Sequence, residues 1–314
     1  MGRQTIIDFF NELKNLFEIN QYPAHSIFNL DETFVSFDQH FKCKVITEIH
    51  SKKPSVPIVP TFEHLTAVCC ISANGEWPTP LLVLPLKTRP DLSCSSLNLF
   101  ALAYQSNGWI DTNIYENYIQ HIFIPFVQNS RILHKCPNQR YLFLVDQHST
   151  RNSELVMKLL FDHNIDYVLL PAHSSTICQP LDLTVFGVFK MLLTKRIQSM
   201  ACDGKFKELS NTEKRVRLLD AAASCLLTSF GSENCRAGFE KAGIFPFNPE
   251  GPLSSTLLVN NTNIDVVNGN RKVRLDQGLL LPNNIAYPHV NEANLDENEL
   301  FIGNENDNGF IYYR

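Results

Sequence analysis

The sequence lacks the apolar run of about 20 residues that a membrane-spanning helix needs. Its strongest short run, Leu81 to Leu86, contains a proline and has only the length of a strand. The chain also does not begin with the basic and then apolar pattern of a secretory signal peptide. We therefore expect a globular protein that has no membrane partner.

Paired cysteines are also missing, because the nine cysteines are odd in number and form no CxxC pair. Neither a disulfide framework nor a zinc knuckle is indicated, so a reducing compartment, the cytosol or the nucleus, is expected. A glycine-rich phosphate loop, a GxSxG elbow and a cysteine–histidine nucleophile pattern are absent too.

A strong positive charge is missing as well, since the formal net charge is −5. This balance argues mildly against a protein that coats DNA. The acidity is uneven, however, and residues 291–308 hold six acidic side chains and no Lys or Arg. Without this segment the rest of the chain is close to neutral.

Hydrophobic patterning predicts an α/β protein. Thr5 to Asn20 has the apolar spacing of an amphipathic helix, and Ser26 to Leu86 contains three consecutive strands with a hairpin turn at Asn74-Gly75. Further strands are expected at Tyr141 to Val145 and Asp166 to Leu170, with helices between and after them. The last of these helices are a long one from Asp182, one behind the capping box of Ser210 and Glu213, and a short one over Glu233 to Ala242.

Three aspartates stand at predicted strand ends or at a helix start, namely Asp31, Asp146 and Asp182. Strand-end loops collect functional side chains in α/β folds. Three converging carboxylates can bind two Mg²⁺ or Mn²⁺ ions, which assist in-line phosphoryl displacement. From spacing alone, each aspartate is as well explained as a cap or a turn residue, and Asp182 in particular can cap its helix.

Three sequence blocks carry a resemblance to a known family. They are FNLDET at Phe28 to Thr33, LVDQHSTR at Leu144 to Arg151, and LLPAHSSTICQPLDLTVFGVFK at Leu169 to Lys190. Secondary matches in the right order are CCISANGEWPTPLLVLP, SNGWIDTNIYENYI and AGIFPFNPE. Together these blocks resemble the DDE superfamily endonuclease domain of the pogo, Tigger and jerky transposases, which are related to the mariner superfamily.

The resemblance implies a ribonuclease H-like fold, with a mixed five-stranded sheet flanked by helices. It also implies that Asp31, Asp146 and Asp182 are catalytic ligands of two Mg²⁺ or Mn²⁺ ions, that DNA is the partner, and that the protein acts in the nucleus. The corresponding domains are an N-terminal helix at 1–25, the catalytic domain at 26–200, a helical extension at 201–250, and a weakly ordered Asn-rich acidic tail at 251–314. A homodimer and chromatin proteins are further candidate partners.

The chain departs from the family in three respects. Gln147 replaces the usual Gly or Asn, and Arg151 stands where His is common. Furthermore, the helix-turn-helix region that precedes the domain in the family does not occur in this sequence. The retained aspartates favour a DDE endonuclease or strand transferase, whereas the missing recognition region favours a transposase-derived DNA- or chromatin-binding protein without cleavage activity.

Several other residues are candidates for contacts. Lys52, Lys53, Arg151 and Lys190 are candidate DNA contacts, although the connection from Phe41 to Pro60 is better explained as a solvated loop than as a phosphate-contacting one. A transition-metal site is a weaker alternative because its candidate ligands lack paired spacing; these ligands are His148, His163, His173 and Cys178. Trp109 and Phe186 are expected to be packing residues rather than base-stacking platforms.

Overall fold

The computed structural model describes residues 2–35, 65–85, 97, 99–151 and 153–258. Lys52 and Lys53, with the connection around them, lie outside the described residues, as does the acidic tail from residue 259 onward. Within the described ranges, no helix has both the length and the apolar character that crossing a bilayer requires.

A six-stranded mixed sheet forms the centre of the fold, in the order β4-β3-β2-β1-β5-β6. Its strands are β1 (Ile27–Val35), β2 (Leu65–Ser72), β3 (Leu81–Leu84), β4 (Ala101–Tyr104), β5 (Tyr141–Val145) and β6 (Ile165–Leu169). β1, β2 and β3 pair antiparallel, whereas β5 is parallel to β1 and β6 is parallel to β5. This arrangement confirms the ribonuclease H-like fold expected from the sequence.

The expected number of strands was wrong by one. β4 pairs parallel with β3 at the edge of the sheet and was not predicted. Its four residues, ALAY, have no alternation of polar and apolar side chains, so periodicity carries no signal there.

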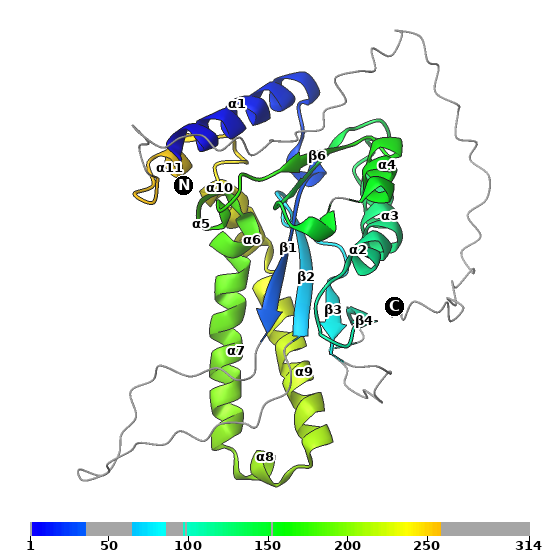
Figure 1. The fold of residues 1–314 in the computed structure, drawn as a ribbon, viewed down its shortest axis with the longest axis vertical. Coiled ribbons are helices and arrows are strands. Elements are labelled where there is room, and N and C mark those ends of the chain that lie inside the picture. The colour runs from blue at the N-terminus through cyan, green and yellow to red at the C-terminus, as the bar shows by residue number, and fades with distance from the viewer. Residues whose placement is uncertain (1, 36–64, 86–96, 98, 152, 259–314) are drawn as a thin grey trace, which may run out of the picture.

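The helices surround the sheet (Figure 1). Those before β6 are α1 (Arg3–Asn20), α2 (Thr112–Tyr118), α3 (Ile124–Leu133) and α4 (Glu154–Asp162), with short helical turns η1 (Ala24–Ser26), η3 (Ile119–Phe123) and η4 (Ser149–Arg151). Those after β6 are α5 (Ser175–Cys178), α6 (Pro180–Leu183), α7 (Val185–Cys202), α8 (Gly204–Glu208), α9 (Asn211–Ser229), α10 (Ser232–Lys241) and α11 (Glu250–Leu253). In Figure 1, α7 and α9 form a long hairpin that extends past the ends of β1 and β2.

The sheet buries side chains on both faces, as alternate residues of β1 illustrate. Phe28 and Leu30 belong to a core with α2, α3 and α4, whereas Ile27 and Val35 belong to a core with α1, α7, α9 and α10. Since successive strand residues point to opposite faces, each face receives one set of apolar side chains. A sheet covered on both sides explains why β5 is continuously apolar.

Local signals placed most helix ends correctly. Asp111 and Ser153 accept bonds from the first turns of α2 and α4, and Ser210 with Glu213 forms the expected capping box before α9. Gly243 follows α10 with a φ of 67°, a value that favours glycine. The turn at Gly75 has a φ of 94°, as the Asn-Gly signal indicates.

Two predicted boundaries were wrong at positions that matter for the site. Asp31 lies inside β1 rather than at its end, because the strand continues through Val35. Asp182 does not open a long helix, since it lies in the short α6, which Thr184 separates from α7 with φ −141° and ψ −70°. The Thr184 hydroxyl donates to the carbonyl of Asn234 at 2.8 Å, which ties this break to α10.

Candidate functional site

The pairing of β1 with β5 brings two of the predicted site residues together. Leu30 pairs with Val145 in this parallel ladder, so the next residues of the two strands, Asp31 and Asp146, are neighbours. Asp31 is almost fully buried, whereas the side chain of Asp146 is 37% exposed. The two carboxylates therefore lie at the end of the β1–β5 ladder, where solvent can reach them from the side of Asp146.

A buried asparagine connects this pair to the third predicted residue. The Asn29 side chain donates to the Leu144 carbonyl at 3.1 Å and to Gln179 Oε1 at 2.5 Å, and it accepts from the Leu181 amide at 3.2 Å. Leu181 directly precedes Asp182, and Leu144 is two residues before Asp146. Asn29 thus fixes α6 against β1 and β5 through hydrogen bonds that involve none of the aspartates.

Glu32 is a fourth carboxylate of the site that sequence reasoning missed. Ligand atoms of Asp31, Glu32 and Asp146 all lie within 4.8 Å of one another, and within the described residues they form the only such group of three or more His, Cys, Asp or Glu side chains. The adjacent position of Glu32 in the FNLDET block was the available signal. Strand periodicity gives no such signal, because neighbouring strand residues normally point to opposite faces.

Arg151 occupies the centre of this acidic group. Its side chain has no exposed surface, and it donates to Asp146 Oδ1 and Glu32 Oε2. A third carboxylate oxygen, Asp31 Oδ1, lies 3.8 Å from the same guanidinium. Arg151, a candidate DNA contact from the sequence, is thus bound to carboxylates of the protein itself.

The site carries strong electrostatic interactions. Burial, followed by the charges of Glu32 and Asp182, raises the pKa of Asp31 to about 8, although Arg151 opposes this shift. Burial also raises the pKa of Asp182, and Lys190 on the exposed surface of α7 opposes it. Burial works against the charge of Arg151, but Glu32 and its neighbours outweigh burial and raise the guanidinium pKa.

The donor chemistry of the site fits a divalent metal. Carboxylate oxygens are the ligands that Mg²⁺ and Mn²⁺ prefer. Asp31, Glu32 and Asp146 place such oxygens within 4.8 Å of one another, and the charges of Glu32 and Asp182 act on Asp31. Glu32 Oε1 is buried without a hydrogen-bond partner, as expected of an oxygen that a further cation completes. The guanidinium of Arg151 already neutralises part of the negative charge of these carboxylates.

The alternative transition-metal set is not brought together in the described part of the chain. His148 and His173 are exposed, His163 contacts the Leu159 carbonyl at 2.8 Å, and Cys178 is buried. Burial raises the pKa of the Cys178 thiol to about 12. Cys178 therefore stays protonated and is a poor metal ligand.

The two aromatic candidates have different environments. Phe186 is buried in the core, as expected. Trp109, in contrast, is 51% exposed and stacks on Phe34 with ring centroids 5.7 Å apart. The expectation that Trp109 is a packing residue was therefore wrong in part, since the ring packs on one side only.

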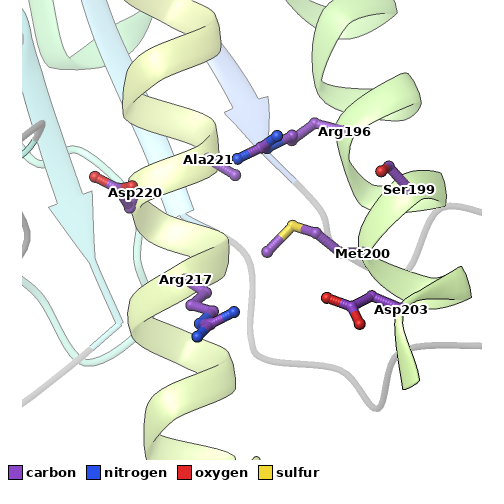
Figure 2. Close-up of a pocket in the computed structure, with 7 residues that line it drawn as sticks. All are labelled: Arg196, Ser199, Met200, Asp203, Arg217, Asp220 and Ala221. Carbon is purple, nitrogen blue, oxygen red and sulfur yellow. The ribbon is translucent and has the colours of Figure 1, made fainter. Parts of the chain in front are cut away.

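A groove between α7 and α9, lined by two arginines and two aspartates, was also missed. Figure 2 shows Arg196 of α7 and Arg217 of α9 directed into one cavity of about 320 Å³, with Asp203 and Asp220 at its margin. A second cavity of about 300 Å³ shares Arg196 and adds Lys195. Among the described residues, neither arginine forms an ion pair, and Asp203 is engaged as the cap of α8.

The family is shown by a match over more than half of the chain. Residues 63–228 match the DDE superfamily endonuclease family, and the chain belongs to that family. The match includes Asp146, Arg151 and Asp182, while Asp31 precedes it. The resemblance to the transposase-derived pogo, Tigger and jerky group is thereby confirmed.

Two curated relatives are similar to part of the chain. The MFS-type transporter clz9 of Cochliobolus lunatus is 28% identical over 155 residues, which cover 49% of this chain and 16% of that protein. The Jerky protein of Mus musculus is 25% identical over 145 residues, covering 44% of this chain and 26% of that protein. The matched regions span about a quarter or less of these relatives.

Solved structures with some likeness come from the Mos1 transposase. Its catalytic domain with Raltegravir and Mg gives a TM-score of 0.43 at 14% identity, covering 80% of this chain and 90% of that one. The pre-cleavage Mos1 transpososome gives 0.42 at 14% identity, covering 74% and 64%. At these scores, the fold of this chain rests on its own strand order and family match.

Proposed function

We propose that the chain is a metal-dependent DNA endonuclease or strand-transfer domain, with Asp31, Asp146 and Asp182 as metal ligands and Glu32 as an additional carboxylate. The observation that supports it best is the close group of Asp31, Glu32 and Asp146, against which the hydrogen bonds of Asn29 fix α6, the helix that carries Asp182. Family membership supports transposase-type chemistry on a phosphodiester.

In this proposal, the protein contributes positioning and charge. Two bound Mg²⁺ or Mn²⁺ ions would activate a water or a 3′-hydroxyl and would stabilise the leaving oxygen. Asp31 and Asp146 orient their oxygens through the β1–β5 ladder, and Asp182 approaches from α6. The burial of Asp31 strengthens the attraction of its carboxylate for a cation.

The DNA backbone contacts in this proposal come from α7 and α9. Arg196 and Arg217 offer two guanidinium groups without ion pairs to one groove, and Lys190 is exposed on α7 nearer to Asp182. Guanidinium groups bind phosphate oxygens with paired hydrogen bonds. Lys52 and Lys53 remain candidates by their sequence alone.

A nicking assay on supercoiled plasmid tests the proposal. The wild-type protein is expected to nick the plasmid with Mg²⁺ or Mn²⁺, and Asp146→Asn to lose that activity. Asp162→Asn is a matched control, since Asp162 is an exposed carboxylate at the end of α4. Nicking that survives in Asp146→Asn would show that the site assignment is wrong.

Arg151 favours a second candidate function, a nuclear DNA- or chromatin-binding protein that does not cleave. Its guanidinium neutralises part of the charge that would otherwise attract metal ions. This candidate predicts a gel shift that weakens with salt while plasmid stays intact in every metal. The same gel-shift and nicking experiments, together with sedimentation for the proposed homodimer, separate the two functions.

A further inference from the structure

Arg151 is held in the acidic group by its backbone as well as its side chain. It ends the η4 turn that follows β5, and its amide donates to the His148 carbonyl at 3.1 Å. The Tyr167 hydroxyl donates to the Arg151 carbonyl at 3.3 Å. These contacts direct the side chain into the protein, where no surface of it is exposed.

The oxygens that bind Arg151 belong to the same compact group that offers metal ligands. Asp146 Oδ1 and Glu32 Oε2 accept from its two terminal nitrogens, while ligand atoms of both residues and of Asp31 lie within 4.8 Å of one another. Mg²⁺ coordinates its oxygens at about 2.0–2.1 Å. An ion at that distance from these oxygens would meet the guanidinium both sterically and through like-charge repulsion.

We propose that Arg151 is a resident counter-cation, which holds the carboxylates together without metal and must leave them before divalent ions bind. The inference rests on the proposed metal-dependent function and deepens it. It makes Arg151 a positioning residue that competes with the metal. The wild-type site should therefore bind metal more weakly than the same site without the charge of Arg151.

The surroundings of Arg151 would allow its side chain to move away from the carboxylates. The arginine Nε is buried without a hydrogen-bond partner, so the resting arrangement leaves one donor unsatisfied. Asp146 is partly exposed, and the neighbouring His148 and Thr150 contact each other at 2.8 Å on the exposed side of η4. A shift of this one turn, with loss of the Tyr167 hydrogen bond, would withdraw the guanidinium from the carboxylates.

Manganese binding in solution tests the inference directly. Calorimetric titration of Mn²⁺ is made on the wild-type protein, Arg151→Gln, Arg151→Lys and the double variant Arg151→Gln with Asp146→Asn. Arg151→Gln removes the charge at similar length and should bind Mn²⁺ at least about tenfold more tightly than wild type. Arg151→Lys keeps the charge and should stay near wild type, and the double variant should lose the gain.

Thermal melting gives a second readout of the same variants. Without metal, Arg151→Gln should melt below wild type, because the carboxylates lose their counter-charge. Saturating Mn²⁺ should raise its melting temperature more than that of the wild-type protein. A purely structural arginine would lower the melting temperature equally with and without metal, which would overturn the inference.

The outcomes separate this inference from the proposed function. Equal Mn²⁺ affinity in wild type and Arg151→Gln overturns the competition and leaves the metal site standing. No binding by any variant overturns the metal-dependent function, and the inference with it. If Arg151→Gln does not fold, the side-chain NMR signals of Arg151 in the wild-type protein serve instead, and Arg151→Lys assigns them. These signals should change when Mg²⁺ is added. Unchanged signals at saturating metal would overturn the inference.

Discussion

The carboxamide of Asn29 on β1 donates a hydrogen bond of 2.5 Å to the side chain of Gln179, which directly precedes α6. This contact joins residues that are far apart in the sequence and completely buried in the fold. With the bonds to Leu144 and Leu181, it makes one side chain responsible for the relative positions of three chain segments. Each of those segments carries one of the site aspartates.

Replacing Asn29 by Leu should therefore be costly despite the similar volume. The Leu181 amide loses a buried acceptor, Gln179 and Leu144 each lose a donor, and such unsatisfied groups cost about 1–3 kcal/mol each. We expect the free energy of unfolding to fall by roughly 3 kcal/mol in urea titrations. Asn117→Leu, which removes an exposed hydrogen bond to the Asn113 carbonyl in α2, is the control and should change stability little; a similar loss in both variants would contradict the role of Asn29.

The packing of α10 on α6 predicts a difference between two glycines. A Cβ at Gly238 would lie 2.6 Å from the Pro180 carbonyl oxygen, whereas one at Gly187 would meet no atom within 4 Å. Gly238→Ala should lower the free energy of unfolding by about 1–3 kcal/mol through overpacking. Gly187→Ala in α7 should raise it by about 0.5–1 kcal/mol through helix propensity.

Urea titrations of the two glycine variants measure both effects in one experiment. Because α6 carries Asp182, Mn²⁺ titration of Gly238→Ala then reports whether a displaced α6 weakens the metal site. Equal stability of the two variants would show that α10 and α6 are further apart than the structure has them.

The groove between α7 and α9 predicts a salt-dependent effect on DNA binding. If Arg196 and Arg217 each contact one phosphate, Arg196→Ala with Arg217→Ala should reduce the slope of log K against log salt by about 2. Fluorescence anisotropy with a duplex oligonucleotide at several salt concentrations measures this slope. Lys158→Ala removes an exposed cation of α4 and should leave the slope unchanged.

His25 predicts how stability depends on pH. Burial and the charge of the stacked His134, 4.0 Å away between ring centroids, lower the pKa of His25, while Glu76 opposes this shift; Cys136 and Tyr141 are its other neighbours. Below the ordinary histidine pKa of about 6.5, the unfolded chain takes up this proton before the folded protein does. The contribution of His25 is therefore complete above that pH and is lost as pH falls toward the folded-state pKa.

Urea titrations from pH 7.5 down to 5 check the histidine prediction. His25→Gln should show a shallower fall in stability over this range than the wild-type protein. His173→Asn, at an exposed position, is the control and should keep the wild-type slope. An unchanged slope in His25→Gln would contradict the prediction.

Sequence reasoning located most of the sheet and the helix ends because those features depend on local chemistry. The apolar run of β5, the Asn-Gly turn and the capping box of α9 each act within a few residues. The neighbouring positions of Asp31 and Asp146 follow from the parallel pairing of β1 with β5, which the family resemblance implied. Each of these features depends on contacts within one helix, one turn or one pair of strands.

The features that were missed depend on contacts between distant segments. Arg151 is buried because Glu32 and Asp146 surround it, and no pattern around Arg151 in the sequence indicates a buried cation. The break at Thr184 arises from α10, fifty residues further on. Asn29 looked like an ordinary strand residue, because its three partners come from β5 and from the segment before α6.

The exposed pair of Phe34 and Trp109 gives the molecule a spectroscopic property. Only two tryptophans occur in the sequence, and the other, Trp77, is stacked on Phe230 next to the core. Trp109 stacks on the third residue after Asp31, so its solvent-exposed emission originates close to the acidic group. The intrinsic fluorescence of a Trp77→Phe variant would thus report ligand binding near the acidic group without any added label.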